Sequence, residues 1–82
     1  MNILYFSWLR ECIGVSSESY LTDQTTVREL INELINREPR YAKAFENLEA
    51  IKVAIDHELI VDLDTSIIGV NEIAFFPPMT GG

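Results

Sequence analysis

The strongest helical pattern in this 82-residue chain is TVRELINELINR, residues 26–37. Thr26 and Glu29 have the spacing of a capping box, which predicts a helix that begins after Thr26. Apolar residues then recur at i, i+3, i+4, i+7 and i+8 and form one stripe: Val27, Leu30, Ile31, Leu34 and Ile35. Pro39 prevents the helix from continuing. We therefore expect a helix that covers a core with one face and contacts water with the other.

The residues before this helix predict two strands and a short helix. Residues 3–6 are apolar and favour strands, which predicts a first strand at residues 2–6. Residues 8–13 carry apolar side chains at helical spacing, and Gly14 supplies a stop. Residues 18–22 are a plausible second strand, antiparallel to the first.

The residues after the helix predict further strands. Residues 41–47 indicate one or two helical turns, and the alternation of residues 51–55 is typical of a half-buried strand. The remaining segments are a turn at Asp56–Glu58, a short strand at 59–61, a loop at 62–69 and a final strand at 72–77. Strands on both sides of one main helix predict an α+β fold with a sheet that grips the helix.

Alternation along these strands also predicts which side chains face the helix. We assign to the core Ile3, Tyr5, Ile51, Val53, Ile55, Ile73 and Phe75. Leu4, Phe6 and Phe76 then lie on the open face, with Leu59 beside them from the turn. An apolar group in that position is either a docking surface, with apolar anchors at its centre, or the ordinary exposure of a small domain.

Size, charge and cysteine content narrow the function classes. The chain is long enough for one domain, and its single cysteine permits no internal disulfide. Thirteen acidic against six basic residues give a net charge of −7. This charge argues against nucleic acid as a binding partner and favours a basic cleft on a protein partner. The sequence predicts no membrane span and no export signal, and we expect a soluble, cytoplasmic protein.

The last eight residues, FFPPMTGG at 75–82, bring the most unusual chemistry. Pro77 and Pro78 hold the backbone extended, and Met79 and Thr80 lead to the two smallest residues, Gly81 and Gly82. A glycine carboxylate without a side chain beside it can enter a narrow tunnel and be activated there by a partner. The alternative is an ordinary frayed terminus.

Two other candidates favour structural roles. Cys12 lies on the apolar side of its short helix and is interpreted as a small buried hydrophobe. His57 lies near Asp56, Glu58, Asp62 and Asp64, but one histidine in a loop of solvated carboxylates is more typical of a turn, and we predict no metal site. The body of the chain shows no catalytic constellation.

FFPPMTGG at the C-terminus and YFSWLRECIG at residues 5–14, which contains an Arg-Glu-x-x-Gly motif, resemble the small subunit of molybdopterin synthase. That family consists of ubiquitin-like sulfur carriers. The resemblance implies a ubiquitin-like β-grasp fold, a mixed sheet of four to five strands on one main helix, with the domain at residues 1–77 and the extended tail at 78–82. The frequent Gly-Asp of the family before the last strand is replaced here by Gly69-Val70-Asn71-Glu72, a departure that affects only a turn.

The resemblance also implies a function. An ATP-dependent, ubiquitin-activating-type enzyme would adenylate Gly82, and sulfur would replace AMP to give a thiocarboxylate. The tail would then donate sulfur to cyclic pyranopterin monophosphate in the large subunit, within an assembly of two small and two large subunits. Phe6, Leu59 and Phe76 align with the apolar docking residues of the family, and no cofactor is expected to be bound. Alternatives are a protein modifier joined to lysines through Gly82, a carrier for another sulfur pathway, and an interaction module with an inert tail.

Overall fold

The predicted capping box begins the main helix of the domain. In the computed structural model, which describes residues 1–78, α2 spans Val27–Arg37. Thr26 Oγ1 accepts a hydrogen bond from Glu29 N (3.2 Å), and Glu29 Oε1 accepts one from Thr26 N (3.1 Å). These two bonds satisfy amide groups at the helix start that have no partner within the helix. Most of the predicted apolar stripe is buried, and Ile35 is half-buried.

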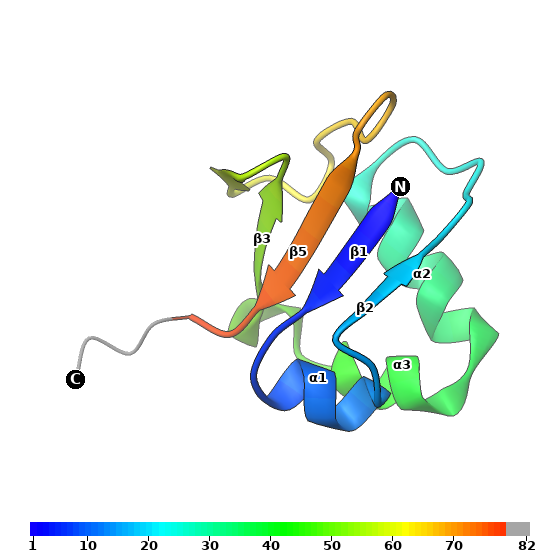
Figure 1. Cartoon of the computed structure of the whole chain (residues 1–82), viewed down its shortest axis with the longest axis vertical. Coiled ribbons are helices and arrows are strands. Elements are labelled where there is room, and N and C mark those ends of the chain that lie inside the picture. The colour runs from blue at the N-terminus through cyan, green and yellow to red at the C-terminus, as the bar shows by residue number, and fades with distance from the viewer. Residues whose placement is uncertain (79–82) are drawn as a thin grey trace.

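Five strands form one mixed sheet in the order β2-β1-β5-β3-β4. The strands are β1 (Asn2–Tyr5), β2 (Ser17–Ser19), β3 (Lys52–Ile55), β4 (Glu58–Ile60) and β5 (Glu72–Phe76). The central pair, β1 and β5, is parallel, and the other pairs are antiparallel. Figure 1 shows the sheet with α2 behind it, so one face of the sheet is covered and the other is open.

Three short helical segments complete the domain: α1 (Trp8–Ile13), α3 (Pro39–Ala44) and the 3-10 turn η1 (Leu48–Ala50). Pro39 ends α2, as predicted, and also begins α3, because proline fits the first helical position, where no intrahelical amide bond is needed. The predicted helical turns at 41–47 therefore start two residues earlier. None of the helices within residues 1–78 is long and apolar enough to cross a bilayer.

The second strand was predicted too late in the chain. It spans Ser17–Ser19 rather than residues 18–22, and Leu21 is 93% exposed in the following connection. The β-favouring residues Tyr20 and Leu21 suggested the later position. The ladder instead pairs Ile3 with Glu18 and Leu4 with Ser17, so the strand lies where Glu18 reaches the buried tyrosines described below.

The predicted division between core and open face is confirmed at most positions. Buried residues are Ile3, Tyr5, Ile51, Val53, Ile73 and Phe75, whereas Phe6 is 46% and Leu59 60% exposed. Ile55 was assigned to the core but is only half-buried, because it lies at the end of β3 beside the Asp56–His57 turn. The side-chain period of two therefore predicted the sheet faces correctly.

Candidate functional site

Phe6 follows β1 and Phe76 ends β5, and because these two strands are parallel, both residues lie at the same end of the sheet. Phe6 N donates a hydrogen bond to Phe75 O (3.1 Å). The chain leaves the sheet after β5, as Figure 1 shows, and the next two residues are Pro77 and Pro78. The base of the tail thus lies beside the exposed Phe6.

Phe75 anchors this base in the core. Its ring is fully buried, stacks on Tyr5 with 6.1 Å between centroids, and meets Phe45 edge to face at 5.0 Å. Buried aromatic pairs of this geometry add to the stabilisation that area burial provides. The chain is therefore held firmly up to the residue before Phe76.

A carboxylate holds the aromatic cluster together. Glu18 Oε2 accepts hydrogen bonds from Tyr41 Oη (2.6 Å) and Tyr5 Oη (2.8 Å), and Glu18 Oε1 accepts one from Arg37 Nη1 (3.0 Å). Burial alone would raise the pKa of Glu18, but these three hydrogen bonds outweigh burial and hold its pKa below the usual value. Burial, followed by bonding to the Glu18 carboxylate, raises the pKa of Tyr5 and of Tyr41. Both phenols are therefore protonated donors at neutral pH.

The open face of the sheet is apolar along its centre. The register places Leu4 opposite Ala74, Ala74 opposite Ala54, and Ala54 opposite Leu59, so these side chains form a row across four strands. Phe76, the last residue of β5, lies on the same face and is half-buried. The structure thus brings Phe6, Leu59 and Phe76 to one face, while their binding role stays a prediction.

The other predicted site residues fall in two groups. Met79, Thr80, Gly81 and Gly82 lie outside the described residues. Cys12 is half-buried against the core, and its Sγ lies 3.8 Å from Arg40 O, which fits the structural role that we predicted.

The Asp56–His57 turn is held by local bonds. The Asp56 carboxylate accepts hydrogen bonds from Asn71 N and Glu72 N, and His57 Nε2 lies 3.0 Å from Glu72 Oε2 with its side chain 86% exposed. Within residues 1–78 no group of three or more histidine, cysteine, aspartate or glutamate side chains is placed to hold a metal ion. These acidic residues therefore stabilise a turn and the start of β5.

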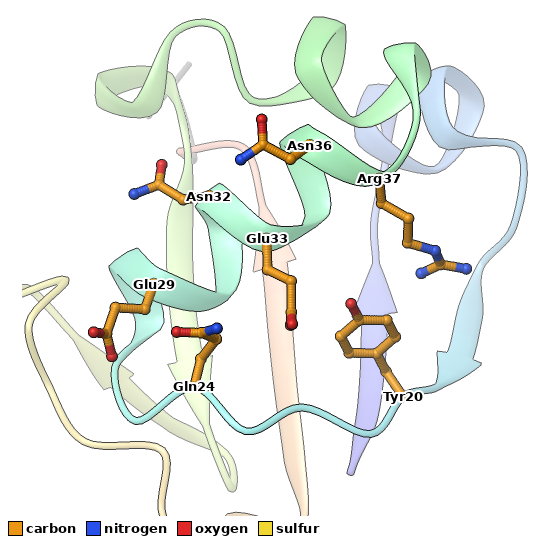
Figure 2. Close-up of a pocket in the computed structure, with 7 residues that line it drawn as sticks. All are labelled: Tyr20, Gln24, Glu29, Asn32, Glu33, Asn36 and Arg37. Atoms are coloured by element: carbon orange, nitrogen blue, oxygen red, sulfur yellow. The ribbon is translucent and has the colours of Figure 1, made fainter.

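A shallow polar hollow of about 590 Å³ lies on the outer side of α2 (Figure 2). It is lined by Tyr20, Gln24, Glu29, Asn32, Glu33, Asn36 and Arg37. Its charged groups already have partners within the domain: Glu29 in the capping box, Glu33 with Thr22 Oγ1 (2.6 Å) and Arg37 with Glu18. We assign no ligand to this hollow.

A mixed five-stranded sheet that holds one main helix defines a ubiquitin-like β-grasp protein. The chain matches the ThiS family over residues 3–82, and it belongs to that family.

Comparisons with individual proteins agree with this assignment. The chain is 35% identical over 82 residues to the molybdopterin synthase sulfur carrier subunit of Haemophilus influenzae, and the match covers 100% of this chain and 99% of that protein. The subunit with the same name from Escherichia coli is 30% identical over 82 residues, with the same coverage. The crystal structure of SAMP1 from Haloferax volcanii shares the fold, with a TM-score of 0.72, 24% identity, and coverage of 100% of this chain and 98% of that one.

Sequence reasoning missed two residues that shape this site. Glu18 gives no local signal, because its partners come from β1, α2 and α3. Lys52 could have been identified, since alternation places it on the open face with Ala54, and the register now puts it beside Phe76.

Proposed function

We propose that this chain is a sulfur carrier for molybdenum cofactor biosynthesis, the small subunit of a molybdopterin synthase. The observation that carries this proposal is the family match, which runs through to Gly82, together with full-length identity of 35% and 30% to two molybdopterin synthase sulfur carrier subunits. The Gly81-Gly82 ending is the feature that this function requires.

The working group in this proposal is the terminal carboxylate. An oxygen of the Gly82 carboxylate attacks the α-phosphorus of ATP on an activating enzyme, so pyrophosphate leaves and an acyl-adenylate forms. A sulfur nucleophile delivered by that system then displaces AMP and leaves a thiocarboxylate. The thiocarboxylate sulfur then bonds to cyclic pyranopterin monophosphate, and water cleaves the acyl C–S bond, which leaves the sulfur on the pterin and restores the carboxylate. Two such rounds supply the dithiolene of molybdopterin.

The domain itself contributes presentation rather than chemistry. The anchor of Phe75 against Tyr5 and Phe45 fixes the point from which the last residues start. Four residues beyond Pro78 can span roughly 13 Å, which is enough to enter a pocket of a partner. In this proposal the large subunit supplies the cationic pocket and the general acid and base groups.

The open face supplies the docking contacts. Leu59 ends the row that runs through Ala54 and Ala74 to Leu4, and Phe6 and Phe76 lie on the same face where β1 and β5 end. Aromatic anchors within an apolar patch of this kind are typical of an interface hot spot. We propose that this face binds the large subunit, with two copies of each chain in the assembly, and also the adenylating enzyme.

The mass of the intact protein isolated from its own cells tests the proposal. We expect a fraction heavier by the difference between sulfur and oxygen, located at Gly82 by fragmentation and lost when Gly82 is deleted. High-mass conjugates that depend on Gly82, with no sulfur-bearing fraction, would favour the protein modifier instead. Molybdopterin formation that continues without Gly81 and Gly82 would contradict the proposal and favour an inert tail.

A further inference from the structure

The proposed docking face carries one cation, Lys52. The register pairs Lys52 with Phe76, and alternation places its side chain on the open face with Ala54. The residue is exposed, and it is the only lysine or arginine in the five strands. A positive charge therefore lies beside the aromatic residue at the base of the tail.

Three of the other cations are neutralised within the domain. Arg28 pairs with Asp64 at 2.8 Å, Arg37 with Glu18 at 3.0 Å, and Arg40 with Glu38 at 2.9 Å. Lys52 forms no ion pair with any carboxylate in the described part of the chain, and the same holds for Arg10 and Lys43, which lie on α1 and α3. Lys52 is thus the one unpaired cation on the open face.

Two nearby carboxylates leave this charge uncompensated. Glu72 lies on the same face but four residues from Phe76 along β5, about 13 Å away at the rise of a strand. Its carboxylate contacts His57. Glu49 lines the same hollow of about 280 Å³ as Lys52 but forms no ion pair with it.

An apolar partner surface over this face would remove water from the Lys52 ammonium group. A cation that loses its water without gaining a partner strongly destabilises a complex. A carboxylate opposite the cation offsets this desolvation cost and fixes the register of the two proteins. The chain as a whole has a net charge of −7, and among the strands only Lys52 offers a cation to a carboxylate, so on the open face this complementarity is confined to one place.

We propose that the large subunit presents a carboxylate opposite Lys52, and that this ion pair, beside Phe76, selects the correct partner and sets its register on the open face. The inference rests on the proposed function, because it takes the large subunit as the protein that covers this face. It adds to the apolar anchors a charged contact of defined sign and position.

Binding of the large subunit from the same organism to Lys52→Glu, Lys52→Arg and Lys43→Glu tests this proposal by calorimetry. Lys43 is also exposed and unpaired within the described residues but lies on α3, so Lys43→Glu makes the same change in net charge away from the face. We expect Lys52→Glu to weaken binding by roughly 30-fold or more, because losing one partner of a buried charge pair has an effect of about this size. Lys52→Arg and Lys43→Glu should stay within about fivefold of the parent chain.

Two results would overturn the ion pair: Lys52→Glu that binds like the parent chain, or Lys43→Glu that loses as much affinity as Lys52→Glu. Phe76→Asp separates this failure from failure of the proposed docking. If Phe76→Asp abolishes binding while Lys52→Glu does not weaken it, only the ion pair is wrong. If Phe76→Asp binds normally, the open face is not the docking surface. Thermal unfolding of each variant shows whether the domain has remained folded.

Discussion

Two adjacent phenylalanines at the end of β5 should respond differently to the same substitution: one should lose stability and the other should lose binding. Phe75 points into the core and is fully buried, whereas Phe76 lies on the open face and is half-buried. Replacing each by alanine removes the same atoms from neighbouring positions. The pair therefore compares stability with docking and needs no further control for side-chain chemistry.

The structure sets the expected magnitudes. Truncating a fully buried phenylalanine costs about 3–5 kcal/mol, and Phe75 also loses its contacts with Tyr5 and Phe45. At about 4–8 °C per kcal/mol for a domain of this size, Phe75→Ala should lower Tm by roughly 12–40 °C. Phe76→Ala should cost at most about 1 kcal/mol of stability but at least about 2 kcal/mol of binding, or roughly 30-fold in Kd.

Thermal unfolding and calorimetric titration with the large subunit measure the two effects. Phe75→Ala should lower Tm strongly, and Phe76→Ala should mainly weaken binding. Equal losses of Tm in the two variants would show that the assignment of the two faces is wrong. A Phe76→Ala chain that is stable and binds normally would remove Phe76 from the docking surface.

Three further substitutions test the fold that presents the tail. Glu18→Gln removes the carboxylate charge from three bonds, so the two from tyrosine hydroxyls become neutral and the one from Arg37 keeps only the guanidinium charge. It should cost about 2–3 kcal/mol near pH 7, with Glu46→Gln as an exposed control. Because the folded-state pKa of Glu18 is lowered, its stabilisation is present above about pH 4.3 and is lost as the pH falls through the folded-state pKa, so the Tm difference from the parent should shrink there; a constant difference would contradict this. His57→Gly should stabilise by about 0.5–1 kcal/mol, because His57 has φ of 73° and glycine adopts this conformation without strain; a lower Tm would show that its contact with Glu72 matters more. Thr26→Ala should cost about 1 kcal/mol in urea unfolding through loss of the capping box, and an unchanged midpoint would show that the cap is redundant.

Local patterns in the sequence predicted most of the fold. The capping box at Thr26 and the apolar stripe of α2 need only neighbouring residues, and both are present. The alternation in β5 predicted that Phe75 is buried and that Phe76 lies opposite. Such features depend on the spacing of residues along the chain, which a single sequence shows.

Contacts between distant segments could not be predicted in this way. Glu18 fixes the position of β2 through Tyr5 and Tyr41, which are 13 and 23 residues away, so the sequence suggested a strand too far along the chain. The place of Lys52 beside Phe76 likewise depends on the antiparallel register of β3 and β5. Both required the pairing of strands to be known.

The central claim is that the carbonyl carbon of Gly82 is the atom that carries sulfur. Its most direct test is a single-turnover reaction of the large subunit and cyclic pyranopterin monophosphate with two forms of this chain, one ending in a thiocarboxylate and one in a carboxamide at Gly82. We predict that the thiocarboxylate form gives molybdopterin in proportion to the sulfur it carries and that the carboxamide form gives none. Equal product from the two forms would contradict the account.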